Sequence, residues 1–238
     1  MSHYAALDIV NLHFRYPDGT AALNGVNLHV HEGDRVGLLG ANGAGKSTLL
    51  LHLNGIHIPE SGTVSVFGIA VQRKTLREAR QRVGLIFQNP DDQLFCPTLY
   101  DDIAFGPRQM GMSEHDVRHR VDHAVEESGL NPDLLQKNVF HLSFGQKKLA
   151  SIATALAMDA RILVFDEPTI GLDPRARKNI MRLLRRIGRT QIVASHDFGL
   201  LRDICTRVAV MHKGVVSAEG APAEILDDDL LLKRNDLS

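Results

Sequence analysis

A run of small residues followed by a lysine and two hydroxyl residues lies in the first quarter of the chain. Glycine and alanine let the backbone curl tightly, so that successive N–H groups point inward at phosphate oxygens. The lysine of such a loop reaches the β- and γ-phosphates, and the serine hydroxyl suits Mg²⁺. The loop comprises Gly40, Ala41, Asn42, Gly43, Ala44, Gly45, Lys46 and Ser47, and Thr48 follows it. It predicts a binding site for a nucleoside triphosphate.

The segments on both sides of this loop have the patterns that it requires. Residues 35–39 form a short apolar run, which is typical of a buried strand, and residues 46–53 are rich in leucine. The leucine-rich segment is typical of a helix, and we expect its N-terminus to face the anion. An ordinary glycine-rich turn is the alternative, but it would require neither a strand before it nor a helix after it.

Two adjacent carboxylates follow a second hydrophobic run, and a histidine follows a third. Buried strands of open α/β sheets end at the ligand crevice, so these side chains should lie where the phosphates lie. We expect Asp166 to join the Mg²⁺ shell and Glu167 to polarise an attacking water. The alternative for this pair is an acidic turn at a strand end. His196 alone would be read as a structural residue, but at the tip of a core strand it can contact the γ-phosphate.

A third pattern opens an amphipathic helix whose apolar residues recur at positions 149, 152, 153 and 156. Ser143 and Gly145 lie at the start of this helix. A small residue and a glycine at a helix start expose backbone donors to an anion. The phosphate loop already provides one phosphate cradle, so the second must serve a different ATP molecule.

In this order and spacing, these elements resemble the ATP-binding cassette (ABC) family over almost the whole length of the chain. The aspartate loop of that family is matched by Asp173, which is also a good N-cap residue before a proline suited to a first helical position. The matching elements are the phosphate loop 40–48, Gln88 after a strand, the signature 142–146, the acidic strand with Glu167, and His196.

The resemblance implies that two ATP molecules are sandwiched between two such domains. Each phosphate loop then faces the partner's signature, where Ser143, Gly145 and Gln146 act on the neighbour's γ-phosphate. Lys46, Glu167 and His196 are the implied catalytic residues, and Ser47, Gln88 and Asp166 serve Mg²⁺ directly or through water.

Two aromatic positions bear on this resemblance. Tyr16 matches the family's aromatic residue that stacks on adenine, whereas its rival Phe14 lies in the preceding β-like run, which favours a place in the core. Phe144 stands where the family usually has glycine. The backbone N–H remains, so we expect anion binding to persist. The bulkier side chain affects how closely this loop approaches its partner.

Residues 87–95 and 14–19 resemble the ATPases of energy-coupling-factor importers, which take up vitamins or transition-metal ions through separate membrane subunits. By themselves, residues 89–92 are simply a turn. Lys147 and Lys148 after the signature, and the short segment after the last hairpin, favour the cobalt or nickel members. The expected partners are a second ATPase subunit in a homodimer, a transmembrane coupling protein and a substrate-binding protein. The expected location is the cytoplasmic face of the membrane.

Composition agrees with a peripheral subunit. The 27 basic and 28 acidic residues nearly cancel, so no global field attracts nucleic acid, and we expect no nucleic-acid partner. Two cysteines suit a reducing cytosol. The N-terminus has no signal pattern, and no stretch approaches the ~18 uninterrupted apolar residues of a membrane helix. Any spanning part is therefore expected in another chain.

The apolar patterns predict an α/β P-loop NTPase core with a mixed or parallel sheet. Residues 26–30 alternate between apolar and polar, which indicates a half-buried antiparallel strand. Residues 83–87, 162–165 and 192–194 are continuously apolar, as in a parallel sheet covered on both faces. The predicted division is a catalytic core with an antiparallel β subdomain (1–88 and 141–220), an inserted helical subdomain (89–140) and a short C-terminal tail (221–238).

Two tempting features favour ordinary surfaces. His115, His119 and His123 repeat every four residues, but at ~1.5 Å per residue the outer two lie roughly 12 Å apart, too far for one ion. A basic run from Arg175 to Arg189 lies opposite apolar residues without interleaved aromatics, which is typical of a solvated helix face.

Two other functions compete with that of an importer ATPase. A soluble ABC protein acting on nucleic acid would carry long coiled coils or two cassettes, and this sequence has neither. A small-molecule kinase would have no use for a second phosphate cradle.

Overall fold

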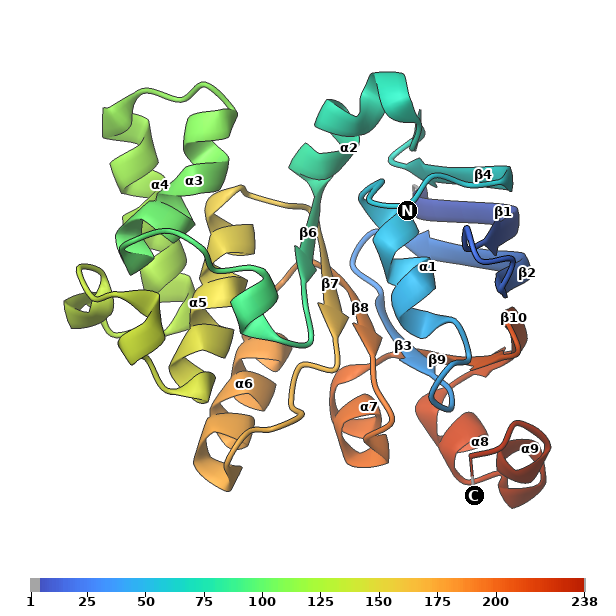
Figure 1. Cartoon of the computed structure of the whole chain (residues 1–238). Coiled ribbons are helices and arrows are strands. Elements are labelled where there is room, and N and C mark those ends of the chain that lie inside the picture. Colours follow the sequence, from blue (N-terminus) through green and yellow to red (C-terminus); the bar gives the residue numbers. More distant parts are fainter. Residues whose placement is uncertain (1–4, 238) are drawn as a thin grey trace.

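The computed structural model describes residues 5–237, which form an α/β fold with two sheets (Figure 1). The smaller sheet is antiparallel, in the order β2-β1-β4-β5. The larger sheet has the order β10-β9-β3-β8-β7-β6 and is parallel except for β10, which runs antiparallel to β9. The strands are β1 (Ala5–Arg15), β2 (Ala21–His31), β3 (Arg35–Leu39), β4 (Ser61–Val66), β5 (Ile69–Ala70), β6 (Val83–Ile86), β7 (Ile162–Asp166), β8 (Thr190–Ala194), β9 (Arg207–His212) and β10 (Val215–Gly220).

Helices cover the larger sheet on one face, and α1 lies between the two sheets on the other (Figure 1). The helices are α1 (Lys46–Leu53), α2 (Leu76–Arg82), α3 (Leu99–Gln109), α4 (Glu114–Ser128), α5 (Phe144–Ala157), α6 (Pro174–Arg186), α7 (Phe198–Ile204), α8 (Pro222–Leu226) and α9 (Asp229–Arg234). Short 3-10 turns occupy Arg73–Thr75, Pro90–Asp92, Pro132–Leu134 and Val139–His141.

Strand β7 shows why the core strands are apolar throughout. Its residues Leu163 and Phe165 pack into the core under the helices, whereas Ile162 and Val164 pack into the core shared with α1 and the smaller sheet. A strand covered on both faces needs apolar side chains at every position. Strand β2 instead buries every second residue over Val26, Leu28 and Val30, as its alternation predicted. The predicted α/β P-loop fold with an antiparallel sheet is confirmed.

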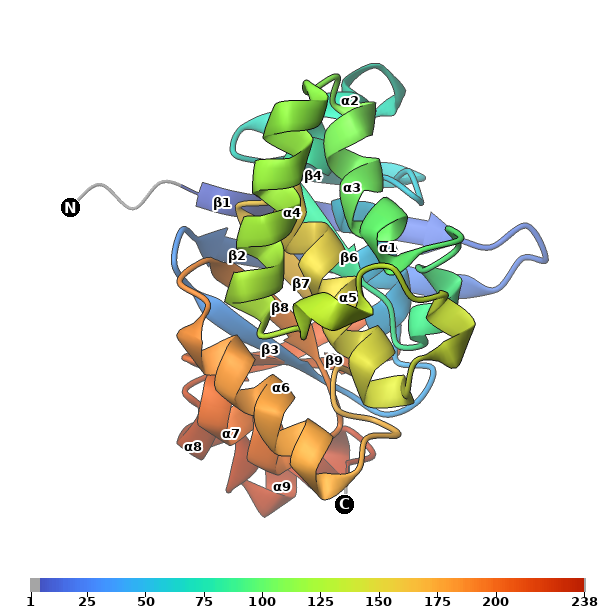
Figure 2. The same cartoon turned by 90° about the vertical axis from the view of Figure 1, so that its left-hand side faces the viewer.

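The helical region lies beside the larger sheet, where α3 and α4 pack on α5 (Figure 2). The side chain of Ser113 caps α4 by accepting a hydrogen bond from the amide of Asp116, and Gly129 ends the helix with a φ of 71°. The exact division of the chain at residues 89 and 140 stays a prediction.

Helix α6 carries the predicted basic run. Ile180, Leu183 and Leu184 are buried, and the basic residues at positions 175, 178, 182, 185 and 186 are exposed. The prediction of a solvated basic face is confirmed for the helix itself. It is wrong for Arg189, which follows the helix, is only 20% exposed and is paired with Glu127 and Asp159.

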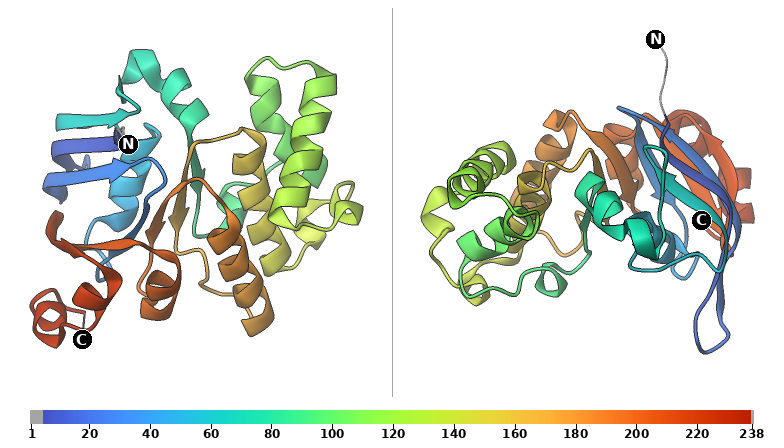
Figure 3. Two further views of the ribbon diagram at one scale, coloured as in Figure 1. Left: turned by 180° about the vertical axis from the view of Figure 1, so that it is seen from behind. Right: turned by 90° about the horizontal axis from the view of Figure 1, so that it is seen from above.

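The segment expected as a short C-terminal tail contains α8, which packs against α7, and α9, which packs against α8 (Figure 3). Ile225, Leu226 and Leu232 are buried there. The turn between β9 and β10 also reaches far back along the chain, because the amide of Gly214 donates to the carbonyl of Ala44 across 3.1 Å. The last hairpin thus supports the loop that follows β3.

Candidate functional site

The loop between β3 and α1 depends on glycines that no other residue could replace without strain. Gly43 and Gly45 have φ values of 79° and 102°, in the left-handed region that favours glycine. A Cβ on Gly45 would lie 2.7 Å from the carbonyl oxygen of Ala22. The start of α1 carries neither a side-chain cap nor an acidic residue in its first turn. Its first amides are therefore available to an anion, and the helix dipole favours negative charge there.

Lys46 lies inside the loop, with its ammonium on the loop's own carbonyls. Its Nζ donates to the oxygen of Gly40 across 2.6 Å and to that of Ala41 across 3.1 Å. Burial lowers the pKa of Lys46, while the nearby carboxylates of Glu167 and Asp166 oppose that shift. A cation held in this way is positioned for a phosphate group bound to the surrounding amides.

Glu167 and His196 come together at the ends of neighbouring strands. The carboxylate of Glu167 accepts from the Ser195 hydroxyl across 2.9 Å and from the His196 amide across 3.2 Å, and His196 Nδ1 lies 2.8 Å away. Glu167 has a φ of 44°, which is strained for a residue with a side chain. An ionised carboxylate only accepts, so Nδ1 carries a proton in this contact and the ring is oriented by it. Such strain and fixed orientation are common where a side chain must act at one place.

One cavity of about 420 Å³ gathers most of the residues expected at the phosphates. Tyr16 lies at its edge and its hydroxyl is 2.9 Å from Thr48 Oγ1. Phe14 packs edge-to-face on Tyr16 with 5.2 Å between ring centroids, and it also packs against the core, as expected. The lining residues are Tyr16, Thr20, Ala21, Ala22, Asn42, Gly43, Ala44, Gly45, Lys46, Ser47, Thr48, Gln88, Asp166, Glu167, Ile170 and His196. Gly40 lies beneath the loop, where a Cβ would come within 2.6 Å of the Met211 carbonyl oxygen.

Sequence reasoning missed Thr20, Ala21, Ala22 and Ile170 in this lining. Thr20 ends the turn that carries Tyr16, and Ala21 and Ala22 begin β2. Their only signal in the sequence is that they directly follow this turn. Ile170 follows the acidic pair by three positions, and nothing in its type indicated a place at the site.

The donor set beside Lys46 suits a magnesium ion bound together with phosphates. Ser47, Gln88 and Asp166 share the cavity, and a hydrogen bond from Ser47 opposes the burial that raises the pKa of Asp166. A carboxylate whose charge is costly to bury gains from a nearby cation. Within residues 5–237 no group of three or more histidine, cysteine or acidic side chains could hold a metal ion by itself. Mg²⁺ commonly uses one or two carboxylates, waters and substrate phosphates instead, so these residues fit.

The signature residues lie in a different cavity, of about 450 Å³. The Ser143 hydroxyl accepts from the Gln146 amide across 3.3 Å, and the Gln146 side chain accepts from the Ser143 amide across 2.9 Å. This is a capping box at the start of α5. Asp173 caps α6 by accepting from the amides of Arg175 and Ala176. The lining residues are Gly129, Leu130, Asn131, Leu134, Ser143, Gly145, Gln146, Leu149, Asp173, Arg175, Ala176 and Asn179.

The two cavities share no lining residue. The structure therefore brings together the residues expected at the phosphate loop, and separately those expected at the signature, but it does not join the two sets within one chain. Asn131, Arg175 and Asn179 at the signature cavity were not found from the sequence. Asn131 lies in a segment without a motif, and Arg175 and Asn179 belong to the basic helix that was expected to be a solvated face.

Phe144 does not point into the signature cavity. Its ring packs on Gly171, where a Cβ would lie 3.2 Å from the ring. It is 36% exposed and lines a third cavity, of about 440 Å³, together with Ser47, Gln88 and Asp166 of the same chain. The side chain that departs from the family pattern therefore lies over its own chain.

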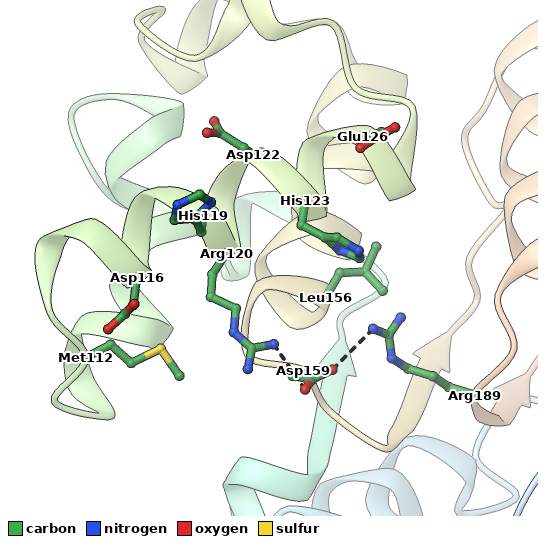
Figure 4. Close-up of a pocket in the computed structure, with 10 residues that line it drawn as sticks. All are labelled: Met112, Asp116, His119, Arg120, Asp122, His123, Glu126, Leu156, Asp159 and Arg189. Carbon is green, nitrogen blue, oxygen red and sulfur yellow. Dashed lines mark hydrogen bonds and ion pairs between the residues drawn. The ribbon is translucent and has the colours of Figure 1, made fainter.

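The largest cavity described, of about 790 Å³, lies between α4 and the C-terminal end of α5 (Figure 4). His119 and His123 line it, and Arg120 and Arg189 both point at Asp159, with nitrogen–oxygen distances of 3.0 and 3.5 Å. The arginines are already paired with acids, and no glycine is among the residues that line this space. Size alone therefore does not make this cavity the phosphate site.

The comparisons with known proteins agree with the geometry. A family model described as "ABC transporter" matches residues 23–170. A putative ABC transporter ATP-binding protein of Gloeobacter violaceus is 46% identical over 232 residues, covering 97% of this chain and 95% of that protein. The energy-coupling factor transporter ATP-binding protein EcfA of Methanothermobacter thermautotrophicus is 44% identical over 236 residues, covering 97% and 76%.

Solved structures give the same result. CbiO1 from Clostridium perfringens, described as part of the ABC transporter complex cbiONQ, has a TM-score of 0.84 at 38% identity and covers 99% of this chain and 96% of that one. A dimeric ATP-binding cassette bound to ADP and Pi has a TM-score of 0.81 at 27% identity and covers 91% and 98%.

The chain therefore belongs to the ABC transporter family. It is an ATP-hydrolysing member of that family, and the resemblance to energy-coupling-factor ATPases is confirmed by these relatives. In the described part of the chain, no helix is long and apolar enough to cross a bilayer.

Proposed function

We propose that this chain is the ATP-hydrolysing subunit of an energy-coupling-factor importer for cobalt or nickel ions. The observation that carries the proposal is the match to EcfA and to CbiO1 over nearly the whole chain, combined with a complete set of phosphate-site residues around one cavity. A vitamin importer of the same type remains the alternative cargo class.

In the proposed reaction, ATP occupies the cavity between Tyr16 and the phosphate loop. The backbone amides of the loop and the Lys46 ammonium bind the β- and γ-phosphates. Bound Mg²⁺ would supply charge neutralisation on the phosphates, and Ser47, Gln88 and Asp166 are the residues that would hold it. The reaction is mainly one of positioning and of stabilising charge that develops on the transferred group.

Glu167 is the proposed base. Ser195 and the His196 amide hold its carboxylate in place, so it can orient the attacking water and accept its proton. His196 meets the same carboxylate through Nδ1, which leaves Nε2 free to face the γ-phosphate. Donation from Nε2 to the phosphate requires the doubly protonated ring, because Nδ1 already needs its proton for Glu167.

The proposed working unit is a homodimer. The signature cavity and the phosphate-loop cavity of one chain share no residue, so a second copy would bring its Ser143, Gly145 and Gln146 to the γ-phosphate. The dimeric cassette with ADP and Pi among the structural relatives supports this arrangement.

Mixing two inactive variants tests the homodimer. Lys46→Ala removes the loop's cation, and Ser143→Arg blocks the signature; each alone should be inactive. Half of the mixed dimers then hold one competent site, so the mixture should recover about a quarter of the wild-type turnover if the sites are independent. In the control, chains with Lys46→Ala are mixed with chains that carry both Lys46→Ala and Ser143→Arg. No dimer then contains an intact phosphate loop, so this mixture should stay inactive. No recovery in the first mixture would contradict sharing of sites between chains.

The proposed membrane partners dock beside the Gln88 loop and the helical region, at the cytoplasmic face. Phe95 and Phe105 are 68% and 42% exposed there and pack edge-to-face at 5.1 Å. They lie beside the loop that follows β6, which suits a partner with an apolar contact surface. These partners would be the transmembrane coupling protein and the substrate-binding protein.

Cargo is tested by uptake in cells that contain the membrane subunits. Cells with the wild-type chain should accumulate cobalt or nickel, measured by mass spectrometry, and cells with Glu167→Gln should not. Accumulation of a vitamin but of neither metal would contradict the proposed metal cargo and would favour a vitamin importer, without contradicting the ATPase activity.

A further inference from the structure

A buried lysine joins the signature helix to the loop that carries Gln88. Lys148 lies in α5 and is 0% exposed. Its Nζ donates to the carbonyl oxygen of Phe87 across 2.9 Å and to that of Gln88 across 2.7 Å. Neither the phosphate site nor the capping box uses this side chain.

The position is costly for a cation. Burial lowers the pKa of Lys148 to about 8, although the carboxylates of Asp166 and Glu167 favour its charge. A buried ammonium loses its hydration, and two neutral carbonyls replace only part of it. A methionine of similar length would fill the space without that loss, but it would leave both carbonyls without their donor. Because these two effects oppose each other, stability alone is a weak reason for a lysine at this position.

Other contacts show how the same loop is fixed to the same helix. Lys147 Nζ lies 2.6 Å from Asp91 Oδ1. The Gln93 side chain donates to the Ser151 carbonyl across 2.9 Å and to Thr154 Oγ1 across 2.8 Å. Lys148 alone among these residues binds the backbone of Gln88 itself.

We propose that Lys148 is a positioning residue for the phosphate site. By binding the carbonyls of Phe87 and Gln88, it fixes the Gln88 side chain near Ser47 and Asp166. The same contact makes the glutamine loop move with α5, the helix that begins beside Ser143. The inference rests on the proposed function for the role of Gln88, while the contact itself can be tested without turnover.

Three variants separate positioning from stability. Lys148→Met keeps the volume but removes both hydrogen bonds, and Lys148→Gln keeps a neutral N–H donor on a shorter side chain. Lys147→Met is the matched control, because it removes the neighbouring lysine and its ion pair with the exposed Asp91 but leaves the Gln88 carbonyl bound.

We expect kcat for Mg-ATP to fall about 10-fold or more in Lys148→Met, with KM changed less than about 3-fold, because residues that orient metal ligands commonly have effects of this size. Lys148→Gln should recover part of the loss, and Lys147→Met should stay close to wild type. The midpoint of urea unfolding of Lys148→Met should stay close to that of wild type, because removing a buried charge offsets the loss of its two hydrogen bonds. A loss of kcat that only follows a loss of stability across the three variants would overturn the proposal.

Amide hydrogen exchange of residues 87–93 gives a readout independent of ATP hydrolysis. These amides should exchange about 10-fold faster in Lys148→Met and be unchanged in Glu167→Gln. If these amides exchanged at the wild-type rate in Lys148→Met, the proposal that Lys148 fixes the Gln88 loop would be wrong. Should the wild-type chain not hydrolyse ATP at all, the proposed function fails, whereas faster exchange in this variant still supports the link between loop and helix.

Discussion

The helix that begins at the phosphate-loop cavity and the helices that begin at the signature cavity differ in whether side chains cap their first amides. At α1 no side chain caps the first amides, and the loop before it turns through glycines with positive φ. At α5 the amide of Gln146 already donates to the Ser143 hydroxyl, and at α6 the amides of Arg175 and Ala176 donate to the Asp173 carboxylate. The first cavity is thus built in advance for an anion, whereas the second is closed upon itself.

The difference indicates how the second cavity can still meet a phosphate. The Ser143 hydroxyl accepts from the Gln146 amide, but it retains its own proton, which it can donate to an oxygen of the neighbour's ATP. The capping box therefore orients this hydroxyl rather than consuming it. If the proposed function is right, the phosphate-loop half of the chain binds nucleotide by itself, and the signature half contributes only when a partner chain presents a nucleotide.

The largest expected effect concerns Glu167, the proposed base. Glu167→Gln should retain ATP binding and form a stable dimer while turnover falls about 10²-fold or more, the scale of losing one key stabilising group. Single-turnover hydrolysis and size-exclusion chromatography with ATP measure the two effects. Normal hydrolysis by this variant would mean that another group acts as the base.

Matched glycine substitutions sharpen the comparison between the halves. Gly45→Ala forces a side chain into left-handed backbone and against the Ala22 carbonyl, so it should cost about 3 kcal/mol of stability or more and abolish nucleotide binding. Gly145→Ala places its Cβ 2.9 Å from the Ala176 methyl, in ordinary helical backbone. There the gain in helix propensity, up to about 1 kcal/mol, offsets part of the crowding.

Isothermal titration of ATP and urea unfolding separate these two glycine variants. Gly145→Ala should bind ATP as the wild type does and lose turnover only. If Gly145→Ala lost nucleotide affinity in the isolated chain as Gly45→Ala is expected to, the proposed division of labour between the cavities would be wrong.

The smallest effect concerns pH and His52 of α1. Its Nδ1 lies 2.8 Å from the Thr48 carbonyl, its Nε2 is buried without a partner among the described residues, and burial lowers its pKa to about 4. The pKa of a histidine in an unfolded chain is near 6.5. Between about pH 4 and pH 6.5, His52 therefore binds a proton in the unfolded chain but not in the folded chain. Stability should therefore fall by about 2 kcal/mol between pH 7 and pH 5.

Urea unfolding at several pH values measures this loss, and His52→Phe should remove the part due to His52. His115→Phe is the control, because that histidine is exposed on α4. An equal pH dependence in the His52→Phe and wild-type chains would show that other groups cause it.

The sequence predicts what is encoded locally. The phosphate loop needs glycine at set positions, and the core strands need apolar residues at every position, so both are legible in residues 35–48 and 162–166. The placement of Phe144 on Gly171 could not be predicted, because it depends on how α5 packs against a loop many residues away. In the sequence Lys148 is simply the second of two adjacent lysines, and only the path of residues 87–93 over α5 shows it to be buried. Helices α8 and α9 are too short for a periodic pattern to indicate them.

The support that the last hairpin gives to Ala44 has a consequence for how the protein is made. The carbonyl of Ala44 can accept its hydrogen bond only after Gly214 has left the ribosome, when most of the chain has been synthesised. At about 5–20 residues per second, that delay is roughly 10–30 s of translation. A nascent chain would therefore emerge with its nucleotide pocket unfinished, and would acquire it only near the end of its synthesis.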